Sequence, residues 1–205
     1  MPRPIEIADL ARIRYLGDPQ IAPDGRRVAY VVTEIDLEGK RYRSAIWVVN
    51  ADGSGRTRFT AGTHKDTSPR WSPDGSRLAV LSDRDGVTQL YVMPSDGGEP
   101  ERITDLKHGV ADPVWSPDGA WLAFVSKVGP EGPVQRADET EEDRKRAAQR
   151  SDTKVIRSLK YKLDGEGYFD DRRRHIFVVS AEGVTPRQIT DGDWDDTQPA
   201  WSPDG

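Results

Sequence analysis

Short runs of apolar residues alternate with turn signals along the whole chain, and three of them share one pattern. They are "PQIAPDGRRVAYVV" from Pro19, "PRWSPDGSRLAVLS" from Pro69 and "PVWSPDGAWLAFVS" from Pro113; a fourth, "PAWSPDG", begins at Pro199. Pro-Asp-Gly is a turn sequence, because proline presets φ and glycine accepts a left-handed backbone. Each copy predicts a hairpin whose first strand carries tryptophan, and whose second alternates apolar and polar residues, as at Leu78 and Val80 or Leu122 and Phe124.

A second pattern follows each of the first three copies. "IWVVNADGSGRTRFT" (46–60), "LYVMPSDGGEPERIT" (90–104) and "IFVVSAEGVTPRQIT" (176–190) align without a gap. Each predicts another hairpin with an acid-glycine turn, such as Asp96-Gly97-Gly98. The closing threonine precedes the next tryptophan by eleven residues each time (60 to 71, 104 to 115, 190 to 201). Four short strands in about 44 residues are typical of a β-propeller blade.

The fold class is therefore all-β: a partial propeller of about three four-stranded blades plus the start of a fourth. Tryptophan recurs at Trp71, Trp115 and Trp201, and Ile21 holds this place in the first copy. A residue that recurs in every unit is expected to pack blade against blade rather than to stack on a ligand.

The copies differ between their second and third strands. This distance is 17 residues from Ala29 to Ile46, 11 from Ala79 to Leu90 and 53 from Ala123 to Ile176. The third blade therefore carries an insertion of 42 residues, placed at about 127–174. Residues 137–152 have the composition of a solvated helix, with acids before bases. Residues 154–177 predict a long hairpin that turns near Asp164-Gly165, a candidate contact with another domain or subunit. The arginine-rich stretches 143–150 and 171–175 are interpreted as exposed charged faces.

Composition narrows the class of protein. Of 205 residues, 35% are hydrophobic and 32% charged, and the net charge is -5, which gives no basic footprint for nucleic acid. The absence of cysteine excludes disulfides, thiolate catalysis and cysteine-ligated zinc. No apolar stretch is long enough for a membrane span or a secretory signal. We expect a cytoplasmic protein that binds neither nucleic acid nor membrane.

Candidate chemistry is sparse. His64 and His108 precede Trp71 and Trp115 by seven residues, and Trp194 holds the same place before Trp201. A position that exchanges histidine for tryptophan predicts packing or loop capping. His175 has no partner at ligand spacing, and the acidic run 191–196 lacks the glycine and glutamate of an EF-hand loop. No HExxH, GxSxG, P-loop or dinucleotide motif occurs. The sequence thus predicts no catalytic, cofactor-binding or metal-binding residue, and no cofactor.

The repeated "WSPDG" and "LYVMPSDGGEPERIT" patterns resemble the propeller repeats of two groups, the prolyl oligopeptidase family of serine peptidases and the Tol-system propeller protein. Residues 7–32, 154–179 and 186–205 are similar to acylaminoacyl-peptidase-type members of the first group. This resemblance implies an N-terminal propeller, commonly seven-bladed, that packs on a C-terminal α/β-hydrolase domain and gates peptide access to its Ser, Asp and His triad. No residue here matches the triad, and Glu141-Glu142 lie outside any amine-binding motif.

The resemblance implies a domain organisation in which part of the protein is missing. Residues 1–17 form a short helical lead, residues 18–205 form an incomplete propeller, and the hydrolase domain is absent. Seven blades need about 300 residues, so we expect an N-terminal piece of a longer enzyme, inactive alone. The exposed face of its last blade predicts self-association, and the insertion hairpin is a candidate homo-oligomer contact. The alternative is a non-catalytic Tol-like scaffold for protein–protein interaction.

Overall fold

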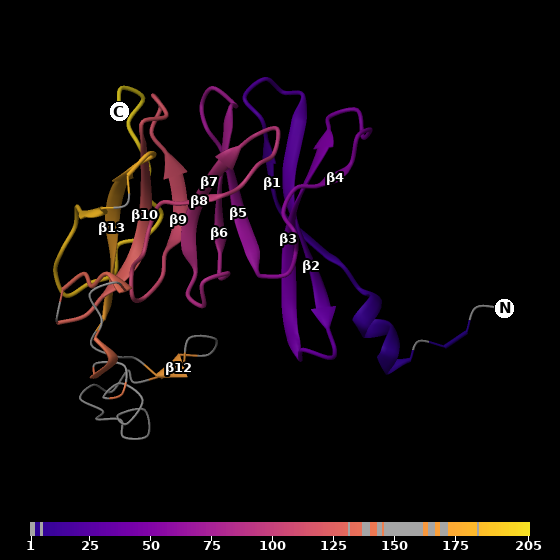
Figure 1. The fold of residues 1–205 in the computed structure, drawn as a ribbon, viewed down its shortest axis with the longest axis horizontal. Coiled ribbons are helices and arrows are strands. Elements are labelled where there is room, and N and C mark those ends of the chain that lie inside the picture. The colour runs from indigo at the N-terminus through magenta and orange to yellow at the C-terminus, as the bar shows by residue number, and fades with distance from the viewer. Residues whose placement is uncertain are drawn as a thin grey trace.

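The computed structural model describes residues 3–4, 6–130, 132–136, 140–142, 145, 162–163, 167–168, 172–183 and 185–205. These residues form three four-stranded antiparallel sheets, which follow one another along the chain and which we call blades 1, 2 and 3 (Figure 1). A short 3-10 helix, η1 (Ile7–Arg12), precedes blade 1. The predicted all-β class is confirmed. In the described part of the chain, no helix has the length and apolar character needed to cross a bilayer.

Each blade keeps its four strands in chain order. Blade 1 contains β1 (Tyr15–Ile21), β2 (Arg27–Asp36), β3 (Arg41–Asn50) and β4 (Thr57–Arg58). Blade 2 contains β5 (Asp66–Trp71), β6 (Arg77–Ser82), β7 (Gln89–Pro94) and β8 (Glu101–Arg102). Blade 3 contains β9 (Ala111–Trp115), β10 (Trp121–Val128), β13 (Arg173–Ser180) and β14 (Arg187–Gln188).

Between β10 and β13 the structure describes one antiparallel pair, β11 (Lys162–Leu163) with β12 (Gly167–Tyr168), on either side of the turn predicted at 164–165. Most of the predicted helix at 137–152, most of the arginine-rich stretch 143–150 and the rest of the predicted hairpin lie outside the described residues.

The Ser-Pro-Asp-Gly turns are held by their own side chains. Ser72 Oγ donates to Asp74 Oδ1 at 2.6 Å, and the backbone N–H of Arg77 donates to Ser72 Oγ at 2.9 Å. Hydrogen bonds from Ser72 and then Ser76 lower the pKa of Asp74 to about 2. Gly75 has a φ of 71°, the left-handed region that glycine enters without steric cost. These local bonds explain why the turn sequence recurs.

The repeated tryptophans join each blade to the one before it. The indole Nε1 of Trp71 donates to the carbonyl of Gln20 at 3.0 Å, and that of Trp115 to the carbonyl of Arg70 at 2.9 Å. Trp201 makes the equivalent bond to the carbonyl of Val114 at 3.2 Å. Trp71 and Trp115 are buried, so their predicted role in blade-to-blade packing is confirmed.

The core consists of two apolar layers, one between each pair of neighbouring blades. Leu78 and Val80 of β6 pack with Ile46 of blade 1, whereas Ala79 and Leu81 pack with the blade 3 cluster around Phe124. Strand β6 is therefore buried on both faces, and β10 is also almost wholly buried. The predicted alternation of apolar and polar positions is wrong for both strands, because these strands are covered on both sides.

The closing threonine of the second pattern has a structural role. In each blade its Oγ1 accepts the backbone N–H of the aliphatic residue that opens the pattern. The distances are 3.0 Å for Thr60 with Ile46, 2.9 Å for Thr104 with Leu90 and 3.0 Å for Thr190 with Ile176. This bond ties the outermost strand and its exit to the third strand, which accounts for the constant length of the pattern.

The two ends of the blades differ. The first-to-second and third-to-fourth turns lie at one end, and their lengths are the same in all three blades. The second-to-third loops and the linkers between blades lie at the other end, together with η1 and β12 (Figure 1). We call this the variable end, because its second-to-third loops differ in length. Loops that differ on a constant scaffold are the usual carriers of function.

Candidate functional site

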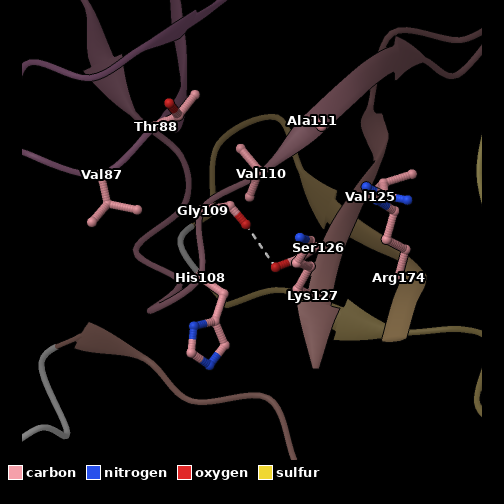
Figure 2. A pocket seen from close by; sticks show the side chains of 10 residues that line it. All are labelled: Val87, Thr88, His108, Gly109, Val110, Ala111, Val125, Ser126, Lys127 and Arg174. Atoms are coloured by element: carbon pink, nitrogen blue, oxygen red, sulfur yellow. Dashed lines mark hydrogen bonds between the residues drawn. The ribbon is translucent and has the colours of Figure 1, made fainter. Parts of the chain in front are cut away.

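At the variable end, a hollow of about 310 Å³ lies where blade 2 meets blade 3 (Figure 2). Its walls come from the β6–β7 loop, the linker into β9, the end of β10 and the start of β13. Apolar side chains form part of the wall, and three basic side chains, His108, Lys127 and Arg174, lie along its rim, with no acidic residue among those that line it. Two of these side chains already have partners: His108 Nδ1 lies 2.6 Å from Arg172 Nη1, and Arg174 pairs with Asp195.

Gly109 allows the linker to approach the β6–β7 loop. Its φ is 72°, and a Cβ at this position would lie 3.0 Å from the carbonyl oxygen of Thr88 and 3.2 Å from Cγ1 of Val87. The next backbone N–H, that of Val110, donates to the same Thr88 carbonyl at 3.0 Å. This wall of the hollow is therefore closely packed, and position 109 leaves no room for a side chain.

Serine, histidine and aspartate meet beside the hollow, but not as a catalytic triad. Ser126 and His175 are cross-strand partners, and His175 Nδ1 lies 3.2 Å from Asp196 Oδ2. The Ser126 hydroxyl, however, donates to the carbonyl of Gly109 at 2.7 Å (Figure 2). A triad requires this proton to be directed at the imidazole. The arrangement stabilises the fold and does not activate a nucleophile.

A charge clamp joins the start of β13 to the acidic run that follows β14. Arg173 Nη2 lies 2.8 Å from Asp193 Oδ1, Arg174 Nη1 lies 3.6 Å from Asp195 Oδ2, and His175 pairs with Asp196 as above. On the other side, Arg172 Nη1 lies 2.6 Å from His108 Nδ1. The last residues of the predicted insertion are thereby held between the linkers that precede and follow blade 3.

The charge clamp corrects the interpretation of 171–175 as an exposed charged face. Arg173 and Arg174 are half-buried and His175 is buried, because the acidic run covers them. A signal was present in the sequence: four consecutive basic residues at 172–175 are matched by aspartates at 193, 195 and 196. Pairing across about twenty residues has no local pattern that would reveal it.

The histidine positions also depart from expectation. Packing or loop capping was predicted for His64, His108 and Trp194. His64 is exposed and Trp194 is 61% exposed, so neither belongs to the core, but the Trp194 ring lies against Gly192 of its own loop. His108 is half-buried at the hollow. Within the described ranges, no group of three histidine, aspartate or glutamate residues is arranged to hold a metal ion.

Comparisons with known proteins give the context for this geometry. The family model described as "TolB beta propeller domain" matches residues 9–154. A protein of Bacillus subtilis (strain 168) named "Uncharacterized peptidase YuxL" is 36% identical over 206 residues, which cover 100% of this chain and 30% of that protein. Dipeptidyl-peptidase 5 of Porphyromonas endodontalis is 37% identical over 90 residues, 44% of this chain and 13% of that protein.

Among solved structures, the acylaminoacyl peptidase of Pyrococcus horikoshii aligns with a TM-score of 0.67 at 22% identity, over 88% of this chain and 25% of that one. This likeness concerns the fold. The chain spans less than a third of the length of the curated relatives that it matches. Since the family model covers well over half of the chain and the sheets have the matching architecture, the chain belongs to the TolB β-propeller domain family.

Proposed function

We propose that residues 1–205 form the N-terminal part of the propeller in a serine peptidase of the acylaminoacyl-peptidase and prolyl-oligopeptidase type. In this proposal the propeller packs on an α/β-hydrolase domain of the same polypeptide and limits which peptides reach the catalytic serine. The observation that carries the proposal is the 36% identity to peptidase YuxL, because it runs through the whole chain, including the insertion in blade 3, rather than through the repeat alone.

The structural difference between the two ends of the blades supports this role. The end opposite the variable end consists of turns whose polar groups form hydrogen bonds with one another, as at Ser72 and Asp74. The variable end has loops of different length and a hollow whose walls are part polar and part apolar, which suits extended peptides. The hydroxyl of Ser126 is held by a carbonyl, so the proposal assigns bond cleavage to another part of the polypeptide.

The finer domain organisation belongs to the same proposal. Residues 1–17 are the lead, residues 18–205 belong to the propeller, and about 127–174 are an insertion with a helix over 137–152. Residues 199–205 begin a fourth blade, an assignment that the Trp201 bond to Val114 supports. The hairpin around 164–165 is a candidate homo-oligomer contact.

The test is hydrolysis by the full-length polypeptide. We expect cleavage of an N-acetylated peptide that carries a chromogenic leaving group, and loss of that activity when the serine labelled by a fluorophosphonate probe is replaced by alanine. Residues 1–205 alone should show neither hydrolysis nor labelling. A full-length polypeptide that is folded but neither hydrolyses acylated or free peptides nor reacts with the probe contradicts the proposal.

The second candidate function is a non-catalytic Tol-like scaffold, which the TolB propeller family model favours. In that case the rest of the polypeptide contains propeller blades without a hydrolase domain, and the probe labels no residue in it. The same labelling experiment therefore separates the two candidates.

A further inference from the structure

The β2–β3 hairpin of blade 1 extends further than its counterpart in blade 2. Strands β2 and β3 have ten residues each, whereas β6 and β7 have six. The last pair of blade 2 is Ser82 with Gln89, and its equivalent in blade 1 is Val32 with Ala45. Blade 1 continues for four more pairs, from Thr33 with Ser44 to Asp36 with Arg41. We call residues 33–44 the overhang; it projects at the variable end (Figure 1).

One face of the overhang is apolar beyond the Thr33–Ser44 pair. Ile35 and Tyr42 are cross-strand partners, and Tyr15 of β1 pairs with Thr33 on the same face. Tyr42 is 60% exposed and Tyr15 is 51% exposed. Ile13, 41% exposed and with extended backbone, lies two residues before Tyr15 and so points to the same side. This face continues the one that packs against blade 2 through Val31 and Ile46.

The opposite face of the overhang is fully charged. It carries Glu34, Asp36, Arg41 and Arg43, which alternate with the apolar set along the two strands. Arg14 Nε lies 2.9 Å from Glu34 Oε1, Arg41 Nε lies 3.5 Å from Asp36 Oδ2, and Arg43 also pairs with Asp36. An antiparallel sheet with one ion-paired face and one aromatic face is typical of a sheet that has water on the first and a partner on the second.

We propose that the apolar face of the overhang contacts the catalytic domain of the same polypeptide. This inference rests on the proposed function. Blade 2 leaves the face uncovered, since its strands end four pairs earlier. The chain accounts for 30% of the length of YuxL, so most of such a protein lies outside these residues, and in the proposed function its catalytic domain packs on the propeller.

The chemistry of the face fits a contact between domains. Tyrosine is enriched at the centres of protein interfaces, because its ring is buried while its hydroxyl still finds a hydrogen-bond partner. Both tyrosine side chains are exposed: Tyr15 pairs with Thr33 where β1 begins, and Tyr42 pairs with Ile35 in the two-stranded part of the hairpin. The Thr33 and Ser44 hydroxyls, 2.8 Å apart, satisfy each other and close the border with blade 2.

Site-specific photo-crosslinking in the full-length polypeptide tests the contact. The photoreactive residue p-benzoylphenylalanine replaces Tyr42 in one preparation and Arg41 in another. These adjacent positions face opposite sides of the same sheet. We expect the residue at 42 to form crosslinks within one polypeptide to the domain labelled by the fluorophosphonate probe, as mapped by mass spectrometry, and the residue at 41 to form none there.

Crosslinks from position 42 to a second polypeptide, to the blade 3 insertion, or to no segment at all overturn the inference. The outcome is separable from that of the proposed function. Hydrolysis without crosslinks to the catalytic domain leaves the function standing and removes this contact. Crosslinks to a downstream domain that neither hydrolyses peptides nor reacts with the probe overturn the proposed function and the catalytic identity of the occupant.

A matched pair of variants measures the strength of the contact. Tyr42→Gln removes the apolar side chain, and Arg41→Gln makes a similar change on the charged face. Loss of a central interface tyrosine should speed proteolytic separation of the two domains by about tenfold, while Arg41→Gln leaves the rate unchanged within about twofold. Because Tyr42 is 60% exposed in the propeller itself, its variant should keep the wild-type circular dichroism of residues 1–205. Equal rates for both variants overturn the inference.

Discussion

Trp115 connects blade 3 to blade 2 through its ring nitrogen and through its ring face. The nitrogen donates to the carbonyl of Arg70, and the guanidinium of Arg77 lies 5.0 Å from the ring centroid. The contact between blades 1 and 2 repeats this arrangement with Trp71 and Arg27. Each blade is therefore attached to its neighbour by directional contacts in addition to apolar packing, which fixes the angle between the two sheets.

Trp115→Phe keeps most of the buried ring and removes the donor. We expect the free energy of unfolding to fall by about 1–3 kcal/mol, because the Arg70 carbonyl loses its partner. Urea denaturation of residues 1–205 provides the measurement.

Trp121→Phe is the matched control, because Trp121 is 42% exposed on the same blade. A surface substitution of this kind should change stability by less than about 0.5 kcal/mol. If the two variants unfold at the same urea concentration, the interblade hydrogen bond contributes nothing.

At the scale of elements, the linker into blade 3 depends on a glycine that meets two constraints at once. Gly109 has a left-handed backbone and a Cβ position 3.0 Å from the Thr88 carbonyl, whereas Gly86 has a φ of 93° and no atom within 4 Å of its Cβ position. Substituting alanine at Gly86 tests backbone strain alone, whereas alanine at Gly109 tests backbone strain together with steric overlap.

Gly86→Ala should cost about 1–2 kcal/mol of folding free energy, from the left-handed backbone alone. Gly109→Ala should lower the folding free energy by about 1–3 kcal/mol more than Gly86→Ala does, because the β6–β7 loop and the linker must move apart. Thermal unfolding of both variants is the measurement, and equal losses would show that the contact at Thr88 is not tight.

Most of the elements could be predicted from the sequence, because their signals are local. Ser72, Asp74 and Gly75 close their own turn, so the turn sequence identified each hairpin directly. Burial of β6 on both faces was missed, since it depends on neighbouring blades. The overhang did have a signal, in the 17 residues between Ala29 and Ile46 against 11 in the second copy, but length alone does not reveal an amphipathic sheet.

At the scale of the whole molecule, the face of blade 1 that points away from blade 2 has the residue pattern of a face that packs against another blade. Val28, Tyr30 and Trp47 occupy the positions that Leu78, Val80 and Tyr91 hold in blade 2, where they are buried against blade 1. On this face Ile21 is 70% exposed and Leu16 is 69% exposed. A contiguous apolar surface of this kind marks a contact with other protein.

Residues 1–205 alone should therefore associate through side chains of this face. Ile21→Arg should shift the distribution towards monomer, because an unpaired charge in an apolar contact is costly. Sedimentation velocity over a range of protein concentrations measures the effect. A wild-type chain that sediments as one monomeric species at every concentration contradicts this expectation.

The first strand of every blade lies at the edge of its sheet, and each is interrupted in the same way. Asp18, Ser68 and Asp112 have φ values of 48°, 53° and 50°, and each is followed by a proline within its strand. The ladder shifts register at all three places. A kinked edge with a missing N–H is a poor template for another β-strand. We therefore expect these edges to be poor sites for amyloid-like growth, even where the apolar faces of the blades are exposed.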